Sequence, residues 1–310
     1  MSEFSLTRTE YSRLPRAVEE LLENALSENT RRAYRADVTS FLAWGGTIPS
    51  TPEQLSAFIA DTAHHLSVPT IRRHLSALSF THETLALHSN PTRDPLVRTA
   101  LKGAARLYGT NQRGVEPLLV EDLRMILEAI DDTVVGQRSK ALLCLGFAGG
   151  FRRSELIGLN CEDIRECPEG LVVKIRKSKT DQAQHGRVIG IPFARGKWCP
   201  VSLIKHWTAL LPDEDGPLFR ACQKGGNILG GRLSSEAVAI TVKSSVKSIG
   251  LDPSKYSAHS LRAGFVTSAI KSGAPSHLVR LQTGHASDAT MARYIRLGNL
   301  FSENAVSWVL

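Results

Sequence analysis

A polar stretch about one third of the way along the chain most constrains its fold. Residues 109–118 have the sequence GTNQRGVEPL, which lacks apolar periodicity and contains the chain-breaking residues glycine and proline. Such a stretch is typical of a connection between domains. The chain has 310 residues, more than one ordinary hydrophobic core organises. The sequence therefore predicts two domains, over 1–110 and 118–310, joined by a linker over 111–117.

The segment before the linker carries helical patterns alone. Its apolar residues recur at helical spacing in four stretches, 27–46, 51–66, 67–87 and 94–109. The second stretch begins with Thr51, Pro52 and Gln54, the residue types that start a helix. The connections between the stretches are short. We therefore expect a compact helical bundle.

The segment after the linker mixes helical and strand patterns. Residues 171–180 and 187–193 are rich in β-branched residues and alternate in polarity, and the polar residues between them predict a β-hairpin. Helical patterns occupy the rest of this segment, including 201–211, 234–249 and the chain from about 260 onward. The predicted fold class is mainly α with a small β-sheet.

Composition limits the partners of such a chain. Its formal net charge is +8 and its pI is near 9.4, which suits a polyanion such as nucleic acid. No apolar run is long enough to span a membrane, and the N-terminus has no secretory pattern, so we expect a cytoplasmic protein. The five cysteines include no C-x-x-C pair, which favours free thiols over disulfides or a zinc site.

Basic residues recur on a second face of the N-terminal helices. An isolated basic run is usually a solvated surface. Here several helices repeat the feature with few acidic residues nearby, so we favour a surface that contacts DNA phosphates, with a solvated face as the alternative. The residues of this surface are Arg31, Arg32, Arg35, Arg72, Arg73, Arg98, Lys102 and Arg106, together with the neighbouring His74.

Two arginines of the C-terminal segment stand in distinctive local sequences. In AGGFRRSELIGL, Arg152 precedes a predicted helix and Glu155 is close enough to orient it. In YSAHSLRAGF, His259 and Arg262 are three residues apart and share a helical face. Each motif by itself is an ordinary structural feature, since arginine–glutamate pairs and polar histidines are common.

A lysine and a tyrosine complete the set. Lys179 lies toward the tip of the predicted hairpin, and His285 precedes Tyr294 by nine residues in TGHASDATMARYI. Two guanidinium groups can hold the oxygens of a phosphate, histidine can move a proton, and tyrosine can attack phosphorus. The combination describes phosphoryl transfer without a metal. The sequence also lacks a Walker A loop, clustered carboxylates and zinc spacing, so no cofactor is expected.

In this order the motifs resemble those of the tyrosine recombinases, the phage-integrase group that includes the Xer- and Cre-type enzymes. GGFRRSEL is similar to the family's first arginine motif, HSLR to its H-x-L-R motif, and TGHASDATMARYI to the motif that ends in the nucleophilic tyrosine. The resemblance covers nearly the whole chain. It implies a helical core-binding domain of SAM-like type followed by a mixed α+β catalytic domain.

The resemblance implies a site-specific recombinase that cleaves DNA through a 3′-phosphotyrosyl link. Tyr294 would attack the scissile phosphate, Arg152 and Arg262 would hold its non-bridging oxygens, and His285 would donate a further hydrogen bond. His285 stands where Cre itself has tryptophan. Arg153, next to the motif arginine, is expected to contact the DNA backbone or to lie at the surface.

The remaining roles concern protons. Lys179 would protonate the departing 5′-oxygen, although Lys174 and Lys177 lie nearby and only one lysine can face the phosphate. His259 would accept the proton of the tyrosine, and Glu155 would steady the site. Neither ATP nor a metal is required, since the covalent intermediate retains the energy of the cleaved bond.

The resemblance also implies partners. They are double-stranded DNA with recombination sites and three further copies of the chain, with a C-terminal segment packed into the neighbouring protomer and with room for accessory proteins. Residues 301–310 end in apolar side chains, for which packing on their own domain is an equal alternative. The expected setting is the nucleoid of a bacterial or phage-type system. Two other functions stay open: a topoisomerase-like enzyme of type IB, and an inactive architectural DNA-binding protein.

Overall fold

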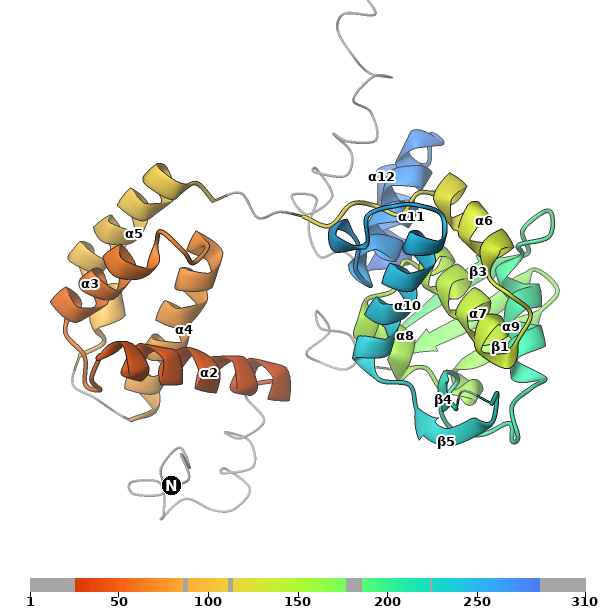
Figure 1. The fold of residues 1–310 in the computed structure, drawn as a ribbon, viewed down its shortest axis with the longest axis horizontal. Helices are drawn as coiled ribbons and strands as arrows, with labels where there is room; N and C mark the ends of the chain where they lie inside the picture. The colour runs from red at the N-terminus through yellow and green to blue at the C-terminus, as the bar shows by residue number, and fades with distance from the viewer. Residues whose placement is uncertain (1–25, 86–88, 111–113, 177–185, 224, 285–310) are drawn as a thin grey trace, which may run out of the picture. The chain divides into compact units, whose positions relative to one another are not determined.

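The described chain forms two compact units. A computed structural model describes residues 26–85, 89–110, 114–176, 186–223 and 225–284. The chain divides into Met1–Arg113 and Gly114–Leu310, and Figure 1 shows the elements of each unit. The fold class is the predicted one, mainly helical with small antiparallel sheets. None of the helices within the described residues is both long and apolar enough to cross a membrane.

The first unit is a helical bundle, as predicted. Its described elements are α2 (Glu28–Trp44), α3 (Pro52–Thr62), α4 (Val68–Thr84), the 3₁₀ helix η1 (Pro91–Arg93) and α5 (Pro95–Tyr108). A side-chain oxygen caps the start of the helices, as at Thr51, which accepts a hydrogen bond from the backbone N–H of Gln54. Phe41 and Phe58 pack edge to face in the core, with ring centroids 5.2 Å apart.

The prediction that His74 lies on a basic face is wrong. His74 is buried, because its position on α4 falls on the apolar stripe with Ile71 and Leu75. Its Nε2 atom lies 3.1 Å from Oδ1 of the buried Asp37. Burial lowers the pKa of His74 and is only partly opposed by the charge of Asp37. His74 therefore belongs to the core of the bundle.

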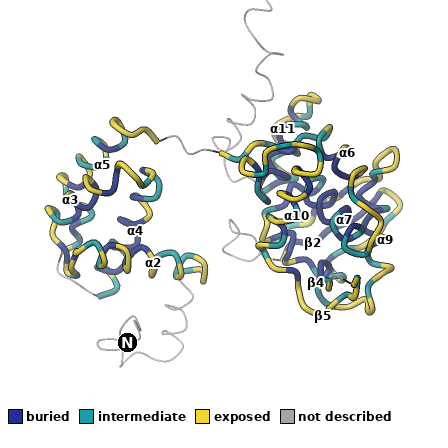
Figure 2. The backbone as a smooth tube through the Cα atoms, in the orientation of Figure 1, coloured by how far each residue is buried: buried dark blue, intermediate teal, exposed yellow. Residues whose placement is uncertain are grey.

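The second unit combines helices with a three-stranded sheet and a two-stranded sheet, and the two-stranded sheet lies at the edge of the unit (Figure 1). Its described helices are α6 (Val120–Ala129), α7 (Val134–Ala148), α8 (Arg153–Gly158), η2 (Cys161–Asp163), α9 (Pro200–Thr208), α10 (Ser235–Ser248), η3 (Pro253–Lys255), α11 (His259–Lys271) and α12 (Ser276–Thr283). α7 is buried along most of its length, as Figure 2 shows, because other elements of the unit pack around it.

The predicted hairpin is present within a larger sheet. Strands β1 (Ile164–Cys167), β2 (Gly170–Ile175) and β3 (Arg187–Pro192) are antiparallel in that order. Strand β2 ends at Ile175, which is paired with Arg187, so it is shorter than the predicted 171–180. Strand β1 and the pair β4 (Arg220–Cys222) and β5 (Ile228–Arg232) were not predicted, since such short segments carry little alternation.

Candidate active site

Arg152 follows a tight turn at the end of α7. Gly150 adopts a left-handed conformation with φ 55°, and a Cβ atom there would lie 2.7 Å from Cγ2 of Thr283. Only glycine fits such a position without strain. The next residue, Phe151, is buried, and Arg152 is the extended N-cap residue of α8. The turn therefore places the guanidinium of Arg152 beside the end of α12.

The buried carboxylate of Glu155 orients Arg152 through hydrogen bonds. Its side chain is fully buried, and Oε1 accepts a hydrogen bond of 2.7 Å from Nη1 of Arg152. Its other oxygen, Oε2, accepts a bond of 2.9 Å from the backbone N–H of Arg152. Oε2 also accepts a bond of 3.0 Å from Nη2 of Arg187, the first residue of β3. One buried carboxylate thus joins two arginines from different elements, which compensates its charge.

Arg262 is buried on α11, three residues after His259. Its Nη1 atom donates to the carbonyl of Gly150 at 2.8 Å and to that of Thr283 at 2.6 Å. The same guanidinium therefore ties the turn after α7 to the end of α12.

Three arginines bind three successive carbonyl groups at the end of α12. Arg187 donates to the carbonyl of Gln282 at 3.0 Å, Arg262 to that of Thr283, and Arg152 to that of Gly284 at 3.2 Å. The last carbonyls of a helix have no partner within the helix and carry partial negative charge. Cations at this end are therefore favourable, and they fix the backbone immediately before residue 285.

The environment of His259 favours the neutral form of its imidazole. His259 is exposed, yet the surrounding protein still desolvates its imidazole, and the charges of Arg262 and Arg152 disfavour the protonated form. All three effects lower the pKa of His259 below its usual value. A neutral imidazole next to two arginines can accept a proton near neutral pH.

The comparisons with known proteins identify the family. The family model described as "Phage integrase family" matches residues 116–299, more than half of the chain. The chain belongs to the phage integrase family.

Relatives across nearly the whole length agree. The chain is 37% identical over 295 residues to the "Integrase/recombinase xerD homolog" of Selenomonas ruminantium, covering 92% of this chain and 86% of that protein. It is 28% identical over 285 residues to the tyrosine recombinase XerC of Thermodesulfovibrio yellowstonii, covering 88% and 87%. The chain is a tyrosine-type site-specific recombinase.

Solved structures share the fold of this recombinase. The XerH site-specific recombinase in a post-cleavage complex with its palindromic difH substrate superimposes with a TM-score of 0.64 at 23% identity, covering 84% of this chain and 73% of that one. Lambda integrase bound to DNA gives a TM-score of 0.63 at 16% identity, covering 94% and 97%.

The structure brings together some of the sequence-predicted residues of the recombinase. Arg152, Glu155, His259 and Arg262 belong to the cluster just described. Four further residues lie outside the described part of the chain: Lys177, Lys179, His285 and Tyr294. Lys174 lies within β2, where it is exposed and paired with Val188. Arg153 is exposed at the start of α8.

Arg187 belongs to this cluster but was not among the site residues predicted from the sequence. Residues 187, 189 and 191 share one face of β3, and Ile189 and Ile191 on that face are buried. A charged residue at a position of the core face is unusual unless it has a buried partner. This alternation was the available signal, and it could have marked Arg187 as a candidate residue of the site.

The basic residues of the first unit differ in their exposure. Arg31 is half-buried, whereas Arg73 is exposed and gives two hydrogen bonds to the buried carboxylate of Asp37, at 2.7 and 2.9 Å. Arg73 therefore has a structural partner that the sequence did not suggest. The other members of the predicted surface are exposed: Arg32, Arg35, Arg72, Arg98, Lys102 and Arg106.

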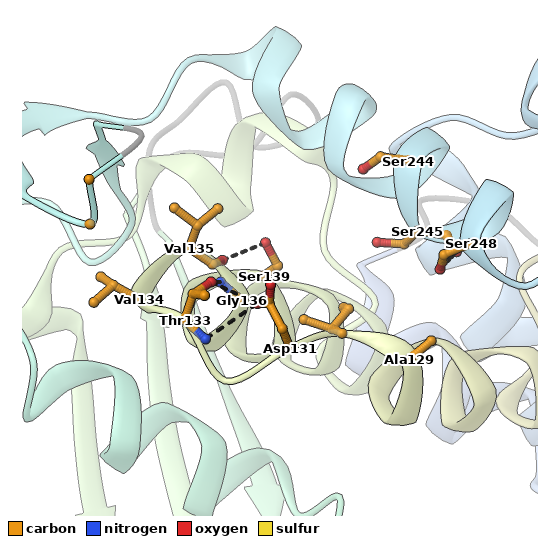
Figure 3. Close-up of a pocket in the computed structure, with 13 residues that line it drawn as sticks. Ala129, Asp131, Thr133, Val134, Val135, Gly136, Ser139, Ser244, Ser245 and Ser248 are labelled. Atoms are coloured by element: carbon orange, nitrogen blue, oxygen red, sulfur yellow. Dashed lines mark hydrogen bonds between the residues drawn. The ribbon is translucent and has the colours of Figure 1, made fainter.

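The described residues of the second unit line at least two hollows. One, of about 720 Å³, is lined mainly by apolar side chains of α6, α7, α11 and α12, including Phe147, Phe265 and Leu278. The other, of about 660 Å³, lies between α7 and α10 and contains Ser139 and Ser244 (Figure 3). Within the described residues no group of three or more histidine, cysteine or acidic side chains is placed to hold a metal ion.

Proposed function

We propose that this recombinase cleaves and rejoins DNA through a 3′-phosphotyrosyl intermediate, using neither ATP nor a metal. The observation that carries the proposal is the convergence of Arg152 and Arg262 on the carbonyls of Gly284 and Thr283, the two residues directly before His285. In a member of the phage integrase family, this convergence supports a single site for the scissile phosphate.

The arginines hold the phosphate during cleavage. Arg152 is anchored by Glu155, and Arg262 is anchored by two carbonyls, so both cations are positioned before DNA arrives. Fixed cations offset the charge that develops on the non-bridging oxygens and need no reorganisation during the reaction. His285 adds a hydrogen bond to the same oxygens.

Two proton transfers accompany the attack. The hydroxyl of Tyr294 attacks phosphorus and gives its proton to His259, whose pKa is lowered so that it is neutral at the start. The bond from phosphorus to the 5′-oxygen breaks, and Lys179 protonates this leaving group. The 5′-hydroxyl of a partner strand then attacks the phosphotyrosine, which releases Tyr294 and reseals the backbone.

We further propose that the substrate is duplex DNA carrying recombination sites, held by a homotetramer. The complexes of XerH and lambda integrase with DNA support the substrate, and a solved structure of a lambda integrase tetramer bound to a Holliday junction supports the assembly. Residues 1–110 and 118–310 act as the DNA-binding and catalytic domains, joined by 111–117. The exposed basic residues of the first unit, together with Arg153, contact phosphates.

The C-terminal segment 301–310 links one protomer to the next. Its last residues include apolar side chains, and the hollow beside α12 offers an apolar surface on which Leu278 is 52% exposed. Burying such surface in a neighbour is favourable. The protein acts in the bacterial cytoplasm, at the nucleoid.

The covalent intermediate provides the test. Purified protein is incubated with fragments of DNA that flank its gene, denatured, and assayed for protein that stays attached to DNA. We expect an adduct with the wild type and none with Tyr294→Phe, which removes only the attacking oxygen. Adducts formed by Tyr294→Phe would show that another residue is the nucleophile. Relaxation of one DNA without exchange between two sites would indicate the topoisomerase-like alternative, and DNA binding without any adduct the architectural one.

A further inference from the structure

Arg187 is a charged residue in a place where charge is costly. It begins β3 on the same face as the buried Ile189, and its own side chain is only 18% exposed. Burial lowers the pKa of Arg187, which the charge of Glu155 partly opposes. Replacing a buried ion pair by well-packed apolar residues of similar size often leaves the stability of a fold unchanged or raises it. The stability of the fold therefore does not explain why an arginine stands at position 187.

The guanidinium of Arg187 bridges two parts of the proposed active site. Its Nη2 atom donates to Oε2 of Glu155 at 3.0 Å, and its Nη1 atom donates to the carbonyl of Gln282 at 3.0 Å. Glu155 in turn accepts two hydrogen bonds from Arg152. One planar group thus connects the carboxylate that orients Arg152 with the end of α12.

The residue after α12, Gly284, lies in close contact with the guanidinium of Arg187. Gly284 is the C-cap residue that follows α12, and it has a left-handed conformation with φ 65°. A Cβ atom on Gly284 would lie 2.4 Å from Nη1 of Arg187, well inside ordinary contact. The backbone before His285 therefore lies directly against this guanidinium.

Arg187 also begins the strand that follows the predicted catalytic lysine in the sequence. It is the eighth residue after Lys179 and pairs with Ile175, the last residue of β2. Three segments that the proposed mechanism requires therefore meet at one side chain: the hairpin with Lys179, Glu155 with Arg152, and the backbone leading to His285.

We propose that Arg187 is a positioning residue of the cleavage reaction. The proposed mechanism assigns it no contact with the reacting atoms, and it holds Glu155, and through it Arg152, in register with the end of α12. The inference rests on the proposed function, because it assumes that Arg152 and His285 act on one phosphate. A displacement of about 1 Å in such a group can slow a reaction about 100-fold.

Two substitutions separate the features of this side chain. Arg187→Lys keeps a positive charge but loses the planar fork that reaches two acceptors at once. Arg187→Met keeps much of the apolar stem and removes the charge. Arg176→Met is the matched control, because Arg176 follows β2 on the same hairpin and also binds two carboxylates, of Asp163 at 2.5 Å and Glu162 at 2.9 Å.

The experiment compares DNA binding with cleavage in the full-length protein. We measure the affinity for the DNA fragment that forms the adduct, and the single-turnover rate of adduct formation with all DNA bound. For Arg187→Lys we expect binding within about threefold of the wild type and a cleavage rate reduced about 10- to 100-fold. Arg187→Met should be slower than Arg187→Lys, and Arg176→Met should cleave at the wild-type rate.

A double substitution tests the route of the effect. If Arg187 acts through Glu155, the variant Glu155→Gln combined with Arg187→Met should cleave not much more slowly than the slower of the two single variants, because residues that act as one unit are not additive. If the double variant instead loses cleavage rate by the full product of the two single-variant factors, Arg187 does not act through Glu155.

The outcomes distinguish this inference from the proposed function. If Arg187→Lys cleaves at the wild-type rate, the positioning role is wrong, while the phosphotyrosyl mechanism stands as long as Tyr294→Phe forms no adduct. Loss of binding and cleavage in equal measure, together with a lower unfolding temperature, would mean that Arg187 is merely structural. If the wild type itself forms no adduct with any fragment, the proposed function fails, and the positioning role fails with it.

Discussion

Replacing Gly284 by alanine tests how closely the end of α12 approaches Arg187. Gly284 has φ 65°, a conformation that costs alanine about 1–2 kcal/mol. The new Cβ would lie 2.4 Å from Nη1 of Arg187 and 3.0 Å from its Cζ. To reach an ordinary contact of 3.4 Å, the guanidinium must retreat by about 1 Å.

That retreat breaks a specific hydrogen bond. The bond from Nη1 of Arg187 to the carbonyl of Gln282 is 3.0 Å long, and lengthening it by about 1 Å takes the two atoms beyond hydrogen-bonding distance. A hydrogen bond to a charged group contributes about 1.5–3 kcal/mol. Together with the conformational cost, we expect Gly284→Ala to lower the free energy of unfolding by about 2.5–5 kcal/mol.

The chain supplies a matched control for this prediction. Gly273, in the turn before α12, has φ 81°, but a Cβ atom there would meet no atom within 4 Å. Gly273→Ala therefore carries the conformational cost alone. Denaturant unfolding of both variants should show that Gly284→Ala loses about 1.5–3 kcal/mol more than Gly273→Ala. Equal losses in the two variants would refute the close contact between Gly284 and Arg187.

Three further predictions concern protons, DNA and assembly. His259 should titrate below pH 6.5, because desolvation by the surrounding protein and the charges of Arg262 and Arg152 lower its pKa. The unfolded chain then binds the proton more readily than the folded one, so protonation of His259 should destabilise the fold as the pH falls below 6.5. Histidine NMR signals of the wild type and of His259→Gln measure this, and a midpoint at or above 6.5 contradicts it. Replacing the exposed Arg98, Lys102 and Arg106 by alanine should weaken the salt dependence of DNA binding, with the slope of log binding constant against log salt concentration reduced in magnitude by roughly 2.7. The control Arg93→Ala removes an arginine that is paired with Glu83, and it should leave this slope unchanged. Deleting 301–310 should leave binding to one site intact and weaken the pairing of two sites, and unchanged assembly on two sites would argue against that role for the segment.

The sequence by itself determined the local features of this protein. Helices α3 and α5 of the first unit follow the N-cap residues Thr51 and Asp94, where a capping side chain and a proline precede an apolar period. These signals act within one or two turns, so they are legible without the fold. The order of the arginine, histidine and tyrosine motifs likewise indicated the family, which the match over 116–299 and the relatives confirmed.

The tertiary structure decided which of these residues meet. Arg187 and Glu155 are 32 positions apart, Arg187 and Gln282 are 95 apart, and Arg152 and Gly284 are 132 apart. Local periodicity carries no information about such pairs, because packing of the sheet, α8, α11 and α12 brings them together. The same reason explains His74, whose burial beside Asp37 depends on α4 facing α2. The sequence named the residues that could bind a phosphate, and only the fold placed three arginines on three successive carbonyls at the end of one helix.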